Sequence, residues 1–156
     1  MKTKLLFSIM FALVSHIFIS QSLDPTFGTN GVLNFDYECD FYEHTISSDG
    51  KIFLPGTFNN ADKKAVLVKI NSDGSLDTTF GINGKVEINN YHAANNTEDF
   101  DNVRILPDGK IVMNYYYNDS GNGGTHILRL NANGTLDNTF NNPVSSNETA
   151  INYFEI

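Results

Sequence analysis

The 156-residue chain contains a single cysteine, Cys39, and therefore cannot form an internal disulfide. We expect this residue to act as a small buried apolar side chain. Basic residues are also scarce, because 10 lysines and arginines stand against 18 acidic residues, for a net charge of −8. An acidic surface repels phosphate backbones, which argues against nucleic acid as a partner. It fits a soluble extracellular surface or cation binding.

The signatures of known catalytic sites are missing too. There is no Gly-x-Ser-x-Gly motif, no glycine-rich phosphate loop and no cysteine–histidine pairing. His44, His92 and His126 lack the spacing of a zinc-binding helix motif. The sequence therefore predicts a protein that is not an enzyme, with no catalytic residues and no obligatory cofactor.

The first 22 residues are typical of a secretory signal peptide. Lys2 and Lys4 precede an apolar run over 5–19, and Ser20-x-Ser22 provides a small-x-small cleavage site. The run is too short and interrupted for a membrane anchor, and no cysteine follows it to carry a lipid. Cleavage removes two lysines and no acid, which leaves a mature net charge of −10. We expect a secreted protein without a stable membrane span.

One motif recurs almost three times in the rest of the chain. It reads SLDPTFGTNG from Ser22, NSDGSLDTTFGING from Asn71 and NANGTLDNTFNN from Asn131. Longer stretches also match, such as SSDGKIFLPG with LPDGKIVMNY. Self-similarity at this period is typical of repeat architectures. We divide the chain into a signal peptide (1–22), a repeat region (23–140, with units of about 23–75 and 76–135) and the start of a further repeat or a truncated tail (141–156).

Each unit is predicted to contain four short strands. Val66, Val68 and Ile70 alternate with residues that face the other way, which is the period of a strand. Asp-Gly and Asn-Gly pairs separate the strands and favour tight hairpins, and no segment after residue 22 has a convincing helical period. The predicted strands are 31–36, 41–47, 51–57 and 65–71 in the first unit, and 84–89, 101–106, 110–117 and 125–131 in the second.

The segment LDTTFG is interpreted as a corner between units. Leu76 and Phe80 stand four residues apart, so one helical turn would place both side chains on the same side, in the seam. Asp77 can accept a hydrogen bond from the N–H two residues on, and Gly81 permits a backbone conformation closed to larger residues. We expect the corner to lead from the last strand of one unit to the first strand of the next. The structural markers of the repeat are Leu76, Asp77, Phe80, Gly81, Leu136, Asp137 and Phe140.

The stretches DGKIFLPG, VLVKINSDGSLDTTFGINGKV and PDGKIVMNY…HILRLNANGTLDNTF resemble the delta-60 repeat, a propeller-like β-repeat of secreted bacterial proteins. The resemblance implies an all-β fold of β-propeller-like blades: two four-stranded units plus the start of a third, in an incomplete propeller. It implies export by a Gram-negative bacterium, through the periplasm to the cell surface or the medium, often by type IX secretion. It carries no catalytic residues. In the third copy Asn141 follows Phe140 where the others have glycine.

The number of units raises the question of what completes the propeller. Closed propellers have about four to eight blades, and this sequence supplies about two and a half. Uncovered sheet edges favour pairing with other chains. We therefore expect either a truncated frame or the first part of a longer propeller, or an oligomer that completes the ring.

Two groups of residues are candidate sites. Asn71, Asp73, Ser75 and Asp77 resemble a calcium loop, although Lys69 is awkward for a cation and Asx-turn chemistry explains the same residues. The tyrosines of NYYYND could stack on sugars or anchor a protein, with packing between blades as the alternative. They are Tyr115, Tyr116 and Tyr117.

Three classes of function follow. The first is a secreted non-catalytic repeat module that binds a glycan or a protein, or acts as a scaffold, outside the cell or at its surface. The second is a structural module stabilised by Ca²⁺. The third is a fragment of a larger propeller enzyme that acts on polysaccharide.

Overall fold

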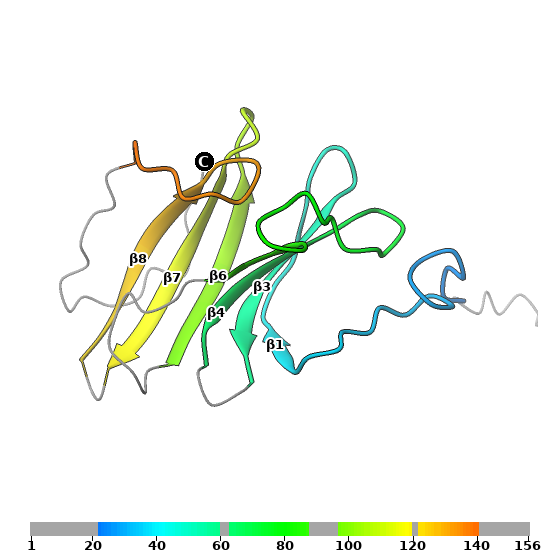
Figure 1. The fold of residues 1–156 in the computed structure, drawn as a ribbon, viewed down its shortest axis with the longest axis horizontal. Helices are drawn as coiled ribbons and strands as arrows, with labels where there is room; N and C mark the ends of the chain where they lie inside the picture. Colours follow the sequence, from blue (N-terminus) through cyan, green and yellow to red (C-terminus); the bar gives the residue numbers. More distant parts are fainter. Residues whose placement is uncertain (1–21, 60–62, 88–96, 120–121, 141–156) are drawn as a thin grey trace, which may run out of the picture.

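A computed structural model describes residues 22–59, 63–87, 97–119 and 122–140 of the chain (Figure 1). These residues form two antiparallel sheets and no helix. The strands are β1 (Cys39–Phe41), β2 (Thr45–Ile46), β3 (Ile52–Phe58), β4 (Ala65–Ile70), β5 (Lys85–Glu87), β6 (Thr97–Ile105), β7 (Ile111–Asp119) and β8 (Asn122–Leu130). The prediction of an all-β fold is confirmed. No helix in the described part of the chain is long and apolar enough to cross a membrane.

Each sheet is a meander in which neighbours along the chain are neighbours in space. The first has the order β1-β3-β4-β5, and β2 pairs with β3 on the same side as β1. β1 and β2 therefore share one strand position, and the sheet has four. The second has the order β6-β7-β8 in the described residues. Its first strand carries a bulge between Asp101 and Arg104, where Asn102 takes a positive φ of 50°.

The main core lies between the two sheets, which stand face to face (Figure 1). β6 lies against β3 and β4. The alternation predicted for β4 is confirmed, since Ala65 and Leu67 face this core while Val66, Val68 and Ile70 face the other side. The buried residues of this core are Phe53, Ala65, Leu67, Phe80, Phe100, Val103, Ile111, Met113, Tyr115, Leu128 and Leu130.

The other face of the first sheet is covered by the segment that precedes it. Leu33, Phe35 and Tyr37 alternate with exposed residues and pack on the cluster around Val66 and Val68. Cys39 lies half-buried in the same layer, and its burial raises the pKa of its thiol to about 12. The thiol therefore stays protonated at neutral pH and acts as the apolar filler that the sequence predicts.

The predicted strand 84–89 belongs to a different sheet from the one expected. Its described part, β5, pairs antiparallel with β4, so it completes the first sheet rather than opening the second. The corner between them thus joins two strands of one sheet, and the expected passage to the next unit is wrong. The predicted strand 31–36 is also absent from the described chain, where only bridges at Gly28–Val32 and Thr29–Val32 form.

The corner places its two apolar side chains on opposite faces of the first sheet. Phe80 is 1% exposed in the core between the sheets, whereas Leu76 packs on the far face. Leu76 pairs with Ile70 as a strand residue, and only the next three residues form a turn, closed by the bond from Phe80 N to Asp77 O (2.9 Å). A strand residue followed by a turn does not keep the helical spacing, so the expected common side is wrong.

The Gly-containing pairs form two kinds of turn, as their chemistry requires. Asn83 and Gly84 both take positive φ (53° and 85°), and Ile82 and Lys85 exchange both backbone hydrogen bonds around them. This is a two-residue type I′ hairpin. At Asn133-Gly134 only the glycine has positive φ, in a three-residue loop closed by Gly134 N to Asn131 O (2.9 Å). The predicted hairpins are confirmed, and the two turn types alternate along the repeat.

Candidate functional site

A repeated contact joins each corner to the turn of the next unit. The backbone N–H of Gly81 donates to the carbonyl of Asn133 (2.9 Å), and Gly28 donates in the same way to Asp73 (2.8 Å). Both acceptors belong to the turn after the third strand of a sheet, namely β8 and β4. We call this contact the corner–turn bond. It explains why the motif recurs, since each copy fastens one unit to the next.

The turn glycine beside this bond has no room for a side chain. A Cβ on Gly134 would lie 2.7 Å from Val86 Cγ2 and 3.0 Å from Gly81 N. A Cβ on Gly74 would lie 2.6 Å from Gly28 N. Glycine at the end of each Asn-x-x-Gly turn is therefore required by the close approach of the next backbone as well as by its positive φ.

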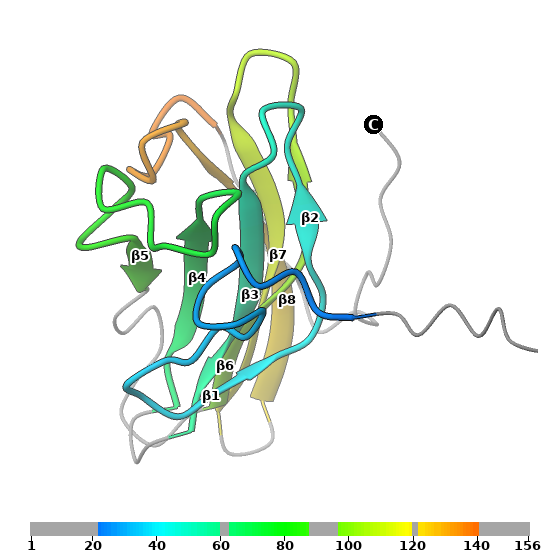
Figure 2. The ribbon, with the colours of Figure 1, turned by 90° about the vertical axis from the view of Figure 1, so that its right-hand side faces the viewer.

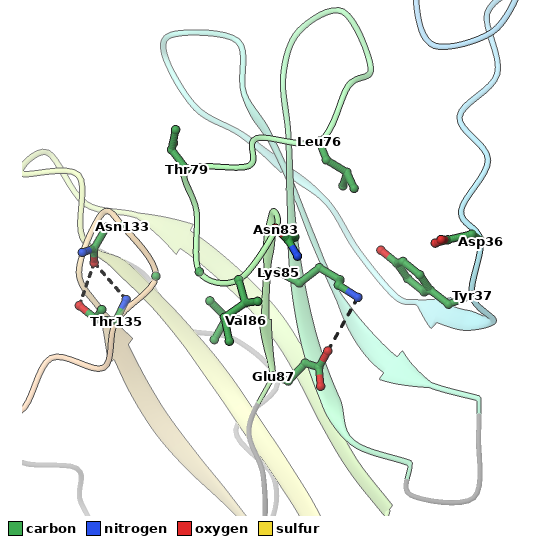
Figure 3. A pocket seen from close by; sticks show the side chains of 13 residues that line it. Asp36, Tyr37, Leu76, Thr79, Asn83, Lys85, Val86, Glu87, Asn133 and Thr135 are labelled. Atoms are coloured by element: carbon green, nitrogen blue, oxygen red, sulfur yellow. Dashed lines mark hydrogen bonds and ion pairs between the residues drawn. The ribbon is translucent and has the colours of Figure 1, made fainter.

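A groove of about 690 Å³ opens beside the corner–turn bond of the second turn (Figure 3). One wall is the corner and β5, another is the turn 133–135, and a third is formed by Asp36 and Tyr37. In Figure 2 the corner, β5 and the turn lie together along one edge of the molecule. The groove therefore exists only because two units are fastened to each other at this point.

The end of the groove near the first sheet carries charge and an aromatic ring. Lys85 Nζ lies 4.4 Å from the centre of the Tyr37 ring and 3.8 Å from Glu87 Oε1 (Figure 3). Burial raises the pKa of the Tyr37 hydroxyl, so the ring stays neutral at physiological pH. This end offers an ammonium group, a carboxylate and an aromatic ring within one short span.

The other end carries amide and hydroxyl groups. Thr135 donates to the Asn133 side chain through its N–H (3.1 Å) and its hydroxyl (2.8 Å), as Figure 3 shows. Asn83 and Thr79 line the wall between the two ends and are exposed. The groove can hold a polar ligand by hydrogen bonds and by contact with the Tyr37 ring.

The corner carboxylate Asp77 is held by two lysines. Its Oδ2 lies 3.2 Å from Nζ of Lys51 and 3.2 Å from Nζ of Lys69, and its Oδ1 accepts the N–H (3.2 Å) and hydroxyl (2.6 Å) of Thr79. The predicted bond from the N–H two residues on is thus present. The Thr79 hydroxyl and both ammonium groups hold the pKa of Asp77 well below its ordinary value.

The second unit repeats this ion cluster. Asp137 Oδ2 lies 3.0 Å from Lys110 Nζ and 2.8 Å from Arg129 Nε, and Thr139 caps the other oxygen. Leu136 and Phe140 flank it, and Phe140 lies under the Arg129 guanidinium at 4.6 Å. The basic partners were not predicted as functional. Their signal in the sequence is the recurrence of Lys51 as Lys110, 59 residues on, just before the second strand of each meander.

The four candidate calcium ligands are close together but are used by internal partners. Asn71 accepts from Lys51 Nζ (2.6 Å) and donates to Ser75 Oγ (2.8 Å). Asp73 caps the N–H and hydroxyl of Ser75 (2.9 and 2.7 Å), and Asp77 carries the two lysines. No group of three or more acidic, histidine or cysteine residues fit for a metal occurs in the described residues.

We expect calcium to leave the stability of the protein unchanged. The ammonium groups of Lys51 and Lys69 stand where a divalent cation would have to lie against Asp77. The melting temperature of the purified protein in millimolar Ca²⁺ should equal that in excess EDTA. A rise in Ca²⁺ that Asp73→Asn abolishes would instead establish the calcium-stabilised module.

The three tyrosines separate between the two faces of β7. Tyr115 is 0% exposed in the core between the sheets, 6.2 Å from the rings of Tyr117 and His126. It therefore packs between units and cannot belong to a binding surface. Tyr117 packs against the same core, and Tyr116 lies half-buried on the opposite face of the strand. The alternative of packing between blades thus accounts for Tyr115 and Tyr117.

Comparison with known proteins supports the repeat architecture. Residues 47–80 and 106–140 match the model of a family described as "Domain of unknown function (DUF5122) beta-propeller". No curated protein and no solved structure matches the chain. The match and the two meander sheets confirm the predicted fold class of propeller-like blades in an incomplete propeller. The resemblance is thus confirmed as one to a β-propeller repeat family, while the delta-60 assignment stays a prediction.

Proposed function

We propose that the protein is a secreted, non-catalytic β-propeller module that binds a glycan in the groove beside the corner–turn bond. The observation that carries the proposal is the pairing of an aromatic ring with polar groups in that groove. Tyr37, Lys85 and Glu87 stand at one end and amide and hydroxyl groups at the other. Sugar rings present C–H faces that stack on tyrosine and hydroxyls that bond to amides and carboxylates.

Secretion and the cell-surface location are part of the same proposal. Residues 1–22, which lie outside the described residues apart from residue 22, have the sequence of a signal peptide. Expression in a Gram-negative host should give a mature chain that starts at Leu23 and leaves the cytoplasm. A cell-associated product that still carries residues 1–22 would contradict this part of the proposal.

The groove is tested by binding of the mature chain to a glycan array. We expect a limited set of glycans to bind, and expect Glu87→Gln and Lys85→Gln to weaken their binding about tenfold, which corresponds to one charge-assisted hydrogen bond. Glu43→Gln is the matched control, because Glu43 is an exposed acid outside the groove and should leave binding unchanged.

Two results would contradict the proposal. If no glycan binds, or if both groove variants bind like the wild type, the groove is not a glycan site. If the mature chain degrades a polysaccharide, and the activity survives purification to homogeneity, the protein is an enzyme.

A further inference from the structure

The N-terminal segment 22–34 reproduces the geometry of the corner and hairpin at 75–87 without the sheet that should accompany it. Thr26 donates its N–H (2.9 Å) and hydroxyl (2.6 Å) to Asp24 Oδ1, as Thr79 does to Asp77. Gly31 N bonds to Phe27 O (2.8 Å), as Gly84 does to Phe80 (2.9 Å). This N-terminal corner is therefore a complete copy of the corner structure.

The partners that hold the other two corners are missing around the first. Asp77 and Asp137 each contact two basic groups, whereas Asp24 is exposed and bonds, among the described residues, only to Thr26. Leu23 is 64% exposed, although its equivalent Leu76 is packed against a sheet. The charged and the apolar contact of this corner are both unfilled.

The strand that follows the corner also lacks its neighbour. β5 follows the second corner and pairs with β4. The equivalent residues after the N-terminal corner, 32–34, pair with no described strand, and Val32 is 44% exposed. Their other side packs on the first sheet through Leu33. The segment therefore presents an edge, an apolar residue and a carboxylate in the arrangement in which a sheet of this repeat would meet them.

Neither described sheet of the chain can fill this place. Lys51 and Lys69 of the first sheet already hold Asp77, and Lys110 and Arg129 of the second already hold Asp137. A second copy of the chain meets the same obstacle, because its corner positions are occupied in the same way. The occupant must be a sheet of the same repeat whose own corner position is vacant.

We propose that residues 22–37 are a docking strand for a further three-stranded sheet of this repeat. That sheet carries a lysine just before its middle strand and a lysine or arginine as the second-last residue of its third strand, as β4 and β8 do with Lys69 and Arg129. The two basic groups bind Asp24, the edge of the third strand pairs with residues 32–34, and Leu23 becomes buried. The N-terminal segment thereby completes a blade whose other strands lie elsewhere.

The test vacates one corner position in the full mature chain. Leu136→Ser, Asp137→Asn and Phe140→Ser together remove the contacts that hold the third corner and leave Lys110 and Arg129 available. We expect this triple variant to associate head to tail in sedimentation velocity, because the N-terminal corner of one copy enters the vacated place of the next. The wild-type chain should stay monomeric at the same concentration.

Asp24→Asn in the triple variant should weaken the association about tenfold, the effect of one charge-assisted hydrogen bond. A folded triple variant that stays monomeric, or that associates equally well with Asp24→Asn, would overturn the proposal. If the triple variant does not fold, the synthetic peptide 22–37 is added to the Asp137→Asn chain. The peptide should raise its melting temperature, and the Asp24→Asn peptide should not. Equal effects of the two peptides, or none from either, would overturn the proposal.

Discussion

Replacing Gly134 by alanine is expected to lower the free energy of unfolding by about 3 kcal/mol, from backbone strain and the lost corner–turn bond. Gly134 has φ +88°, which alanine adopts only at a cost. The new Cβ would also lie 2.7 Å from Val86 Cγ2 and 3.0 Å from Gly81 N, so the corner must move away from the turn. Chemical denaturation of the purified variant measures the change.

Gly109→Ala is the matched control for this prediction. Gly109 has φ +81° in a loop of the same type, but its Cβ would meet only Ala132 Cβ, at an ordinary 3.5 Å. This variant should lose only the backbone term, about 1 kcal/mol. The difference between the two variants therefore isolates the corner–turn contact. Equal losses would show that the contact adds nothing to stability.

Replacing Asp77 by asparagine is expected to cost about 3 kcal/mol at pH 7, the usual effect of breaking a buried ion cluster from one side. Asp77 is 6% exposed, and its removal as a charge leaves Lys51 and Lys69 close together without a counter-charge. Asp73→Asn is the control, because Asp73 is exposed and only caps Ser75, and it should cost far less.

The cost of Asp77→Asn should depend on pH in one direction. The pKa of Asp77 lies below its ordinary value of 3.8 in the folded protein. The carboxylate therefore stabilises the fold fully above about pH 4, and this contribution is lost as the pH falls further. The free energies of unfolding of variant and wild type should converge below about pH 4. A constant difference from pH 7 to pH 3 would show that the charge of Asp77 is not what stabilises the corner.

The sequence was sufficient to predict most strands and the turns, because both depend on local chemistry. The alternation of Val66, Val68 and Ile70 and the Asn83-Gly84 pair give the same answer in any tertiary context. The sheet to which β5 belongs was not predictable in this way. A three-residue strand after a corner can pair with the sheet before it or the one after it, and only its long-range partners decide.

The candidate site was less predictable than the fold. The motif singled out Asp77, but its carboxylate suggested a cation ligand because lysines 26 and 8 residues earlier gave no sign of converging on it. The groove residues Tyr37 and Lys85 come from segments 48 residues apart and meet only through the packing of residues 33–37 on the first sheet. Such contacts depend on tertiary structure, so local pattern does not reveal them.

The most direct test of the corner–turn bond is the hydrogen exchange of the Gly81 amide, followed by NMR on the mature protein. If the corner of one unit is fastened to the turn of the next, this N–H is bonded to Asn133 O, and its exchange should require an opening nearly as costly as global unfolding. Exchange of the Gly81 amide at the rate of an unprotected backbone amide, in a protein whose β4 and β7 amides are protected, would contradict the account.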